Sequence, residues 1–348
     1  MSRISDEPGI DPRIKAVFGG MPTLAQPDAE SREELVAAAN TEAALAQAKA
    51  FEGMLDACNT EEIAPSAGLT SKTVEFISEP DRNTIKVCMF VPESGGPHPC
   101  VYYIHGGGMQ SMSCFLGNYQ AWGKIIAAQG VAVAMVDFRN ALTPSSAPEI
   151  APFPAGLNDC VSGLRWLAKD GASHGIDSSK IIIAGESGGG NLTLATGLKL
   201  NRDGDIGLIQ GLYALCPYIA GSWPRDDLPS SSENNGILLD LHNNRGALAY
   251  GIEALNEGNP LAWPGFATAD DVRGLPPTMV SVNEFDPLRD EGIAFYRTLL
   301  AAGVPASCRQ VMGTIHGTEI FPICCPDVSR ETARSIADFC RGTTRPQA

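Results

Sequence analysis

Three residues of the chain have the types and the order that catalysis by a serine nucleophile requires. Ser187 lies in the segment 185–189 (Gly-Glu-Ser-Gly-Gly), Asp286 follows the apolar run 278–282, and His316 comes later still. A serine hydroxyl becomes a competent nucleophile when a histidine takes its proton and an acid orients that histidine. The three residues therefore predict cleavage of an ester or a related acyl bond.

The segment around Ser187 has the setting of a nucleophile elbow. A β-branched run at 181–183 leads into it, and a helical pattern follows from Asn191. In such a strand–turn–helix unit the serine backbone is strained, and small flanking residues let strand and helix approach each other. Gly185 and Gly189 fill those positions. By itself, the segment is equally typical of a glycine-rich turn with a solvated serine.

A second glycine-rich segment, His-Gly-Gly-Gly at 105–108, follows the predicted strand 101–104. Consecutive glycines let a backbone approach a ligand with its N–H groups free. Such donors stabilise the oxyanion that forms during acyl transfer. We expect His105 to hold this loop by hydrogen bonding rather than to transfer protons.

Other residues compete for the roles of acid and base. Glu284 and Asp290 lie close to Asp286, but Asp290 and Glu291 suit the first turn of the next helix, where the helix dipole favours acids. The chain order Ser, Asp, His is that of α/β-hydrolases and selects His316 over the histidines at 98, 174 and 242. As a base it must be neutral, so activity should fall as the pH drops through its pKa.

The elements that must position these residues alternate between strands and helices. Apolar and β-branched runs predict strands at 73–77, 84–91, 101–104, 131–136, 181–184, 208–215, 278–282 and 308–312. Apolar residues at helical spacing predict helices at 31–58, 119–129, 158–169, 191–200, 291–302 and 328–340. This pattern predicts an α/β fold with a mostly parallel sheet, helices on both faces and an antiparallel hairpin at one edge.

Two regions depart from the alternation. Residues 219–262 contain an Asp/Pro/Ser-rich stretch and a helix-like run at 238–255. Because active sites of open α/β sheets lie at the carboxyl ends of the strands, we interpret this insertion as a lid. Residues 1–30 are rich in Pro, Gly and Asp, so we expect loose order there. Ser31 then begins a helix, with Glu34 completing a capping box.

Composition and charge narrow the classes of partner. The 348 residues include 44% hydrophobic and 19% charged residues, which is ordinary for a globular chain that buries a sizeable core. A formal charge of −15 opposes binding to phosphate backbones and argues against nucleic acid. No apolar run predicts a membrane span, and the first residues lack a signal-peptide core, so we expect a cytoplasmic protein.

The ten cysteines are scattered and include no C-x-x-C pair, and no histidine pair has metal-ligand spacing. We therefore expect small buried thiols, with neither disulfides nor a metal site.

The motifs together resemble those of the hormone-sensitive-lipase-like carboxylesterases, bacterial family IV. The resemblance covers about residues 70–345. It rests on four blocks that match in order and spacing: 105–108, 185–189, 286–292 (Asp-Pro-Leu-Arg-Asp-Glu-Gly) and 316–317 (His-Gly). It implies the α/β-hydrolase fold, in which residues 61–345 form the catalytic domain, and a cap built from residues 1–60 and the insertion 219–262.

The resemblance also implies the active-site residues. The triad would be Ser187, Asp286 and His316, and the oxyanion hole would use the N–H groups of Gly107, Gly108 and Gly188. The family hydrolyses esters of short to medium acyl chains and needs no cofactor. For this chain, the resemblance implies that the substrate is a small-molecule ester, a class that includes lactones.

Three positions differ from the commoner family pattern. Glu186 and Gly188 replace Asp and Ala, and Thr318 follows the His-Gly pair where an aromatic residue is common. We expect the extra glycine to loosen the turn slightly and Thr318 to reshape the pocket near the base.

Alternatives stay open at this stage. An amidase or peptidase would use the same fold and triad, and a non-catalytic small-molecule receptor would use the same pocket, although such receptors have lost the histidine that this chain keeps. Monomer and homodimer are equally compatible with the sequence. The pocket has five candidate apolar residues, each as typical of core packing: Met109, Tyr218, Trp223, Trp263 and Phe266.

Overall fold

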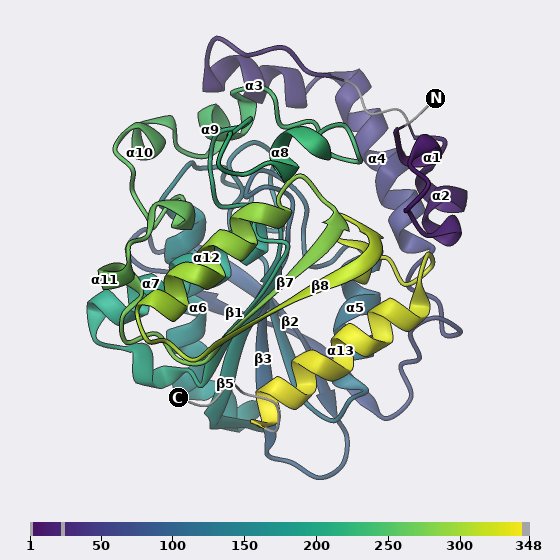
Figure 1. Ribbon diagram of the computed structural model, residues 1–348. Helices are drawn as coiled ribbons and strands as arrows, with labels where there is room; N and C mark the ends of the chain where they lie inside the picture. The colour runs from purple at the N-terminus through teal and green to yellow at the C-terminus, as the bar shows by residue number, and fades with distance from the viewer. Residues whose placement is uncertain (1–2, 22–24, 343–348) are drawn as a thin grey trace.

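The computed structural model describes residues 3–21 and 25–342, which surround one eight-stranded sheet in the order β1-β2-β4-β3-β5-β6-β7-β8 (Figure 1). The strands are β1 (Leu69–Ile77), β2 (Thr84–Pro92), β3 (His98–Ile104), β4 (Ala132–Val136), β5 (Ile176–Glu186), β6 (Gly211–Leu215), β7 (Thr278–Phe285) and β8 (Ala306–Ile315). β1 pairs with β2, and β2 with β4, in antiparallel fashion, whereas all the other neighbours are parallel. The predicted fold class and edge hairpin are confirmed.

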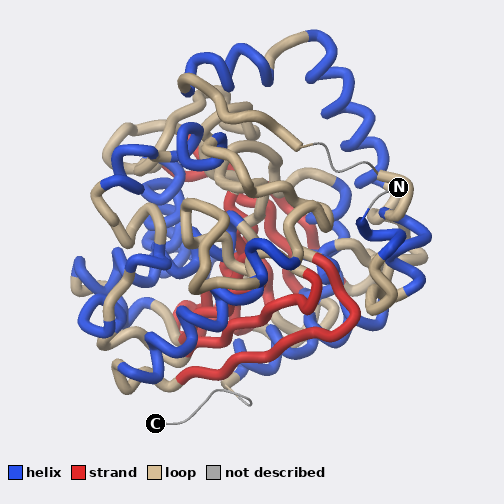
Figure 2. The backbone as a smooth tube through the Cα atoms, turned by 45° about the horizontal axis from the view of Figure 1, so that its top comes forward, coloured by secondary structure: helices blue, strands red, loops and turns tan. Residues whose placement is uncertain are grey.

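Helices cover both faces of the sheet. α6 (Ala155–Asp170), α7 (Gly188–Asp203) and α12 (Arg289–Ala301) lie on one face, and α5 (Gly117–Ala127) and α13 (Pro326–Arg341) lie on the other (Figures 1 and 2). Alternation along β3 shows the same division, because Tyr102 belongs to the apolar cluster under α6 and α7, whereas Tyr103 belongs to the cluster under α5 and α13. A strand that is buried on both faces has a continuous run of apolar residues, and this explains the apolar run at 101–104.

The N-terminal region is more ordered than we expected. It forms α1 (Arg3–Asp6), α2 (Pro12–Phe18), α3 (Arg32–Ala39) and α4 (Glu42–Asp56). Asp11 caps α2, whose Phe18 packs edge-on against Phe321. The expectation of loose order at 1–30 is therefore wrong for its described part; residues 1–2 and 22–24 lie outside the described residues.

The single helix expected from Ser31 to about Cys58 is also wrong, since it divides into α3 and α4. The division occurs at Asn40 and Thr41, where the Thr41 hydroxyl accepts the N–H of Ala44 and begins α4. Ser31 caps α3 as predicted, but the Glu34 carboxylate accepts the N–H of Glu30 instead of that of Ser31.

Four short helices follow β6: α8 (Ser230–Glu233), α9 (Arg245–Tyr250), α10 (Ile252–Asn256) and α11 (Ala269–Val272). α8 and α9 lie with α3 over the carboxyl ends of the strands, whereas α11 lies beside the end of α7 (Figure 1). The helix-like run expected at 238–255 is wrong, because residues 238–244 are irregular and Gly251, with an extended φ of 173°, separates α9 from α10. Leu35 of α3 packs with Ala249 of α9.

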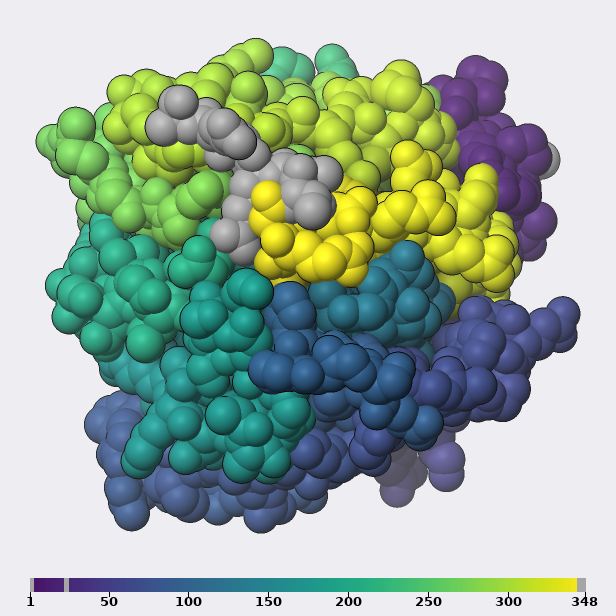
Figure 3. Space-filling view, turned by 90° about the horizontal axis from the view of Figure 1, so that it is seen from below, coloured from purple at the N-terminus to yellow at the C-terminus, as the bar shows by residue number. Residues whose placement is uncertain are grey.

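The opposite end of the molecule carries the end of α13, in yellow, on its surface (Figure 3). Single 3-10 turns complete the fold: Gly171–His174, Ile206–Leu208, Pro264–Phe266 and Thr318–Ile320. Within residues 3–21 and 25–342, no helix combines the length and the apolar character that a bilayer span demands.

A buried ion pair joins α6 to the ends of two strands. The Asp159 carboxylate accepts hydrogen bonds from the Arg139 backbone N–H at 3.0 Å and from its Nε at 2.9 Å. It also accepts the Ser78 hydroxyl at 2.6 Å. Ser78 follows β1 and Arg139 follows β4, so one carboxylate fixes two segments that lie far apart in the sequence.

We predict that Asp159→Asn lowers the free energy of unfolding by about 3 kcal/mol, because it leaves the buried Arg139 guanidinium with only the half-exposed Asp81 as a charge partner. Urea denaturation followed by circular dichroism measures this. Asp270→Asn is the matched control, since Asp270 pairs with Arg273 on an exposed surface, where such pairs contribute little. Equal stability losses in the two variants would contradict the role given to Asp159.

Candidate active site

Ser187 lies on a sharp turn between β5 and α7. Its φ of 57° and ψ of −120° are strained for a residue with a side chain. Three backbone hydrogen bonds hold that conformation: the Ser187 N–H donates to the Leu215 carbonyl, and the Ser187 carbonyl accepts the N–H groups of Asn191 and Tyr218. The serine side chain lines a cavity at the carboxyl ends of the strands.

The glycines flanking Ser187 allow β3 and the turn to approach each other. A methyl group on Gly185 would come within 2.5 Å of the Ile104 carbonyl oxygen, and one on Gly189 within 2.0 Å of the same oxygen. Neither position can take a side chain unless the backbone moves. Because β3 continues into the 105–108 loop, this contact also brings that loop to the serine.

His316 and Asp286 form a buried hydrogen-bonded pair. The Nδ1 atom of His316 lies 2.8 Å from Oδ2 of Asp286, while the other carboxylate oxygen accepts the Leu288 N–H at 2.9 Å. Asp286 follows β7 and His316 follows β8, so neighbouring parallel strands deliver both side chains to one edge of the sheet. His316 lines the same cavity as Ser187.

The environment of His316 favours its protonated form. Burial of the imidazole opposes protonation, but the Asp286 carboxylate outweighs it and raises the pKa of His316 well above its ordinary value. A hydrogen on Nδ1, bound to the carboxylate, leaves Nε2 as the basic nitrogen.

Sequence reasoning missed a buried thiol next to this pair. The Cys216 sulfur, an Asp286 oxygen and a His316 nitrogen lie within 4.8 Å of one another. This spacing suits a metal ion, but His316 and Asp286 are already bonded to each other. Burial raises the pKa of the Cys216 thiol to about 11, so the group is neutral near pH 7. Its one signal in the sequence was its position directly after strand β6.

The glycine loop leaves three backbone N–H groups available near the serine. Gly107 and Gly108 have φ values of 91° and 63°, a region that favours glycine. Within the described chain, the N–H groups of Gly107, Gly108 and Gly188 have no hydrogen-bond partner. A methyl group on Gly188 would lie 2.8 Å from the Gly108 nitrogen. Glycine at 188 thus permits a close approach between two donors, besides any loosening of the turn.

A buried carboxylate holds the start of the loop. One oxygen of Glu186 accepts the Gly106 N–H at 2.7 Å and the Tyr119 hydroxyl at 2.5 Å, and the other accepts the Tyr103 hydroxyl at 2.5 Å. Burial raises the pKa of Glu186 to about 7, although these hydrogen bonds oppose the rise. Glu186 therefore fixes the start of the glycine loop. The sequence, in which Glu186 only precedes the serine, did not predict this role.

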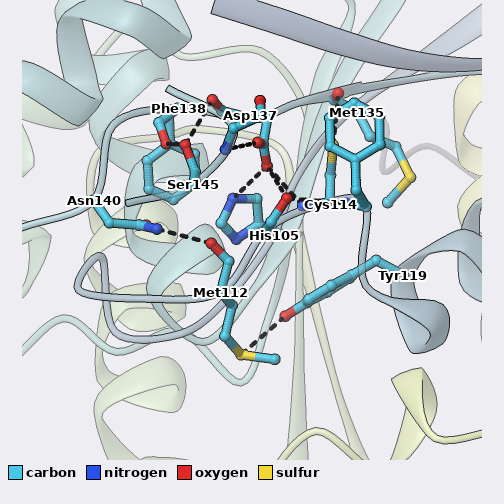
Figure 4. Close-up of polar contacts among 12 residues, drawn as sticks. His105, Met112, Cys114, Tyr119, Met135, Asp137, Phe138, Asn140 and Ser145 are labelled. Atoms are coloured by element: carbon cyan, nitrogen blue, oxygen red, sulfur yellow. Dashed lines mark hydrogen bonds and ion pairs between the residues drawn. The ribbon is translucent and has the colours of Figure 1, made fainter. Parts of the chain in front are cut away.

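His105 is held against Asp137 (Figure 4). Its Nε2 lies 3.6 Å from a carboxylate oxygen that also accepts the Ser113 hydroxyl and the Cys114 N–H, and its ring stacks on Phe138 at 4.3 Å. Burial lowers the pKa of His105, so the ring is neutral and packs as part of the loop's support. This agrees with the expectation that His105 fixes the loop.

The cavity has a volume of about 480 Å³ and a mostly apolar wall. Ser187, His316, Gly107 and Gly108 line it. Apolar side chains come from four regions of the chain, and they include Phe18, Phe51, Met112, Leu238, Leu241, Ile320 and Phe321. Phe18 and Phe51 escaped sequence reasoning because they belong to N-terminal helices that carry no catalytic motif.

Of the five pocket candidates from the sequence, Tyr218 lines this cavity and the other four pack elsewhere. Trp263 is fully buried and donates its indole N–H to the Gly251 carbonyl. Trp223 donates to the buried Glu291 carboxylate and lines a separate, smaller hollow. Met109 belongs to the core under α6 and α7, and Phe266 packs against that core. For these four residues, packing in or against the core is therefore the correct one of the two interpretations that the sequence allowed.

Comparisons with known proteins agree with this fold and site. A family described as having the alpha/beta hydrolase fold matches residues 101–320. The chain is 29% identical over 334 residues to carboxylesterase NlhH of Mycobacterium tuberculosis, covering 95% of each. It is 67% identical to the structure of esterase Est22, covering 98% of this chain and 99% of that one with a TM-score of 0.97.

A third similar structure is a brefeldin A esterase described as a bacterial homologue of human hormone-sensitive lipase. It is 34% identical, with a TM-score of 0.86, and the match covers 98% of this chain and 95% of that one. The chain therefore belongs to the α/β-hydrolase family, in its hormone-sensitive-lipase-like branch, as the motifs indicated.

We predict that Glu186→Gln lowers kcat by about tenfold with a smaller change in KM. The amide offers one acceptor oxygen in place of two, so the Gly106 N–H and both phenols can no longer all be accepted, and the donors of the loop lose their alignment. Steady-state kinetics on an activated ester measures this. Tyr103→Phe, which removes one phenol, is the control and should cost less; a larger loss there would contradict the assignment.

Proposed function

We propose that this protein is a serine carboxylesterase that hydrolyses short- to medium-chain esters through an acyl-enzyme on Ser187. The observation that carries the proposal is the convergence of three parts on one apolar cavity: the serine on its strained turn, the His316–Asp286 pair, and the unpartnered N–H groups of the glycine loop. These are the nucleophile, base and oxyanion donors of ester cleavage.

In the first half-reaction, Nε2 of His316 takes the proton of the Ser187 hydroxyl as the serine oxygen attacks the ester carbonyl. The N–H groups of Gly107, Gly108 and Gly188 stabilise the oxyanion, and His316 returns the proton to the departing alcohol. Asp286 stabilises the imidazolium that forms meanwhile. In the second half-reaction, water attacks the acyl-enzyme with the same base, releasing the acid and the free serine.

The cavity also supports a two-part domain organisation. We assign residues 61–345 to the catalytic domain, and residues 1–60 and 219–262 to a cap. Phe18 and Phe51 come from the first cap segment and Leu238 and Leu241 from the second, and all four line the cavity with Ser187. A wall shared by cap and catalytic domain limits the acyl chain that can be accommodated.

Ser187→Ala should abolish hydrolysis of p-nitrophenyl esters while leaving the circular dichroism spectrum unchanged, because it removes the nucleophile and nothing else. For the wild-type protein, kcat/KM should peak between acetate and octanoate and fall by dodecanoate. Turnover by the alanine variant near the wild-type rate would refute the acyl-enzyme, and a rise out to dodecanoate would refute the enclosed pocket.

The pH profile should report His316. Since Asp286 raises the pKa of His316, the neutral base is populated only above a pH higher than the ordinary histidine value of about 6.5. We expect kcat/KM to fall as pH drops through that raised pKa. Asp286→Asn removes the charge, so it should move this acidic limb to lower pH and reduce kcat by roughly 10⁴-fold. An unmoved limb would contradict the pairing.

A further inference from the structure

Three of the side chains that line the cavity end in polar groups that the described part of the chain leaves without a partner. Arg245, Gln110 and Tyr218 all face the space that Ser187 faces. Among residues 3–21 and 25–342, neither the Arg245 guanidinium, nor the Gln110 amide, nor the Tyr218 hydroxyl has a hydrogen-bond or ion-pair partner. Polar groups in an apolar cavity are costly unless a ligand satisfies them.

The Tyr218 hydroxyl and the Gln110 amide lie beside the residue that follows Arg245, and the Gln110 amide also lies beside the glycine loop. A methyl group on Gly246, the residue after Arg245, would lie 2.0 Å from the Tyr218 hydroxyl oxygen and 3.7 Å from Gln110 Nε2. A methyl group on Gly108 would lie 3.0 Å from the same amide nitrogen. The Gln110 amide therefore lies between the oxyanion donors and the start of α9, where Arg245 begins the helix.

Among the described residues, no acid forms an ion pair with Arg245, although Arg245 lines the cavity. Nine other arginines of the described residues form ion pairs, in a protein whose formal charge is −15. The two acids of the cavity wall are engaged elsewhere: Glu186 holds the glycine loop, and the Asp240 carboxylate accepts the Gln26 N–H at 3.1 Å and the Asn235 amide at 2.8 Å. Within the described residues, no protein group pairs with the positive charge of Arg245, which leaves it available for a ligand.

We propose that the substrates carry a carboxylate in addition to the scissile ester, and that Arg245 binds it with Gln110 and Tyr218. A guanidinium presents paired donors that match the two oxygens of a carboxylate. Such substrates are half-esters of dicarboxylic acids or acyl esters of hydroxy acids. The inference rests on the proposed esterase function and specifies its substrate class.

Two matched pairs of esters test this. On the acyl side, mono-p-nitrophenyl glutarate is compared with p-nitrophenyl valerate, which ends in methyl instead of carboxylate. On the alcohol side, 4-carboxyphenyl valerate is compared with 4-acetylphenyl valerate. The readout is the ratio of kcat/KM for the anionic ester to that for its neutral partner, measured in each variant.

In one of the two pairs, Arg245→Gln should lower that ratio about tenfold or more, the loss expected for a hydrogen bond between charged groups. Arg245→Lys, which keeps the charge but not the fork of donors, should recover part of it. Arg297→Gln, on the exposed surface of α12 and away from the cavity, is the control and should keep the wild-type ratio.

Ratios in Arg245→Gln equal to the wild-type ratios for both pairs would overturn the proposal. Failure of the esterase function itself would look different: the neutral esters would not be hydrolysed by the wild-type protein, or would be hydrolysed equally by Ser187→Ala. The anionic preference and the ester chemistry are therefore judged by separate measurements.

Discussion

The contact between the end of β3 and the turn at Ser187 is the constraint on which the site depends. The Ile104 carbonyl oxygen lies so close to Gly185 and Gly189 that a methyl group on either would overlap it. This contact fixes the serine and the glycine loop in one unit, since the loop is the continuation of β3. A pre-positioned oxyanion site needs such rigidity, because donors that must reorganise during the reaction stabilise the transition state less.

Buried acids then fix the loops that the sheet alone cannot hold. Glu186 accepts the Gly106 N–H, Asp137 accepts the Cys114 N–H, and Glu291 accepts the N–H groups of Ile219 and Ala220 as they leave β6. Each carboxylate is in an interior that penalises its charge, and for Glu291 burial raises the pKa to about 8. Each satisfies backbone donors that irregular segments would otherwise leave unpaired.

The sequence was informative wherever one residue type was required by local chemistry. The order of the strands' apolar runs predicted the sheet, and the Gly-x-Ser-x-Gly segment predicted the turn whose φ at Ser187 is positive. It was uninformative wherever the partner lies far along the chain. Phe18 and Phe51 reach the cavity through the tertiary packing of helices that carry no motif. Trp223 lies outside the cavity, where its indole N–H donates to Glu291. The break at Thr41 shows the same limit, because a side-chain cap interrupted a run whose composition favoured one helix.

The catalytic residues and the residues of the cavity wall come from different parts of the fold, and this explains how the same catalytic residues can act on different substrates. The serine, the base and the oxyanion donors come from strand ends and from turns that tolerate almost no added volume. Much of the wall comes from α2, α4, the irregular segment 238–244 and the start of α9, which touch the chemistry only through the cavity. A change from apolar to charged recognition, such as a free arginine at 245, can therefore arise on the wall without disturbing the strained serine turn. The formal net charge of −15 opposes an anionic ester, but exposed charges are screened beyond about 10 Å and so act weakly at long range. Selection for a carboxylate must instead come from a local cation inside the cavity, where screening is weak and a paired set of donors is held in place.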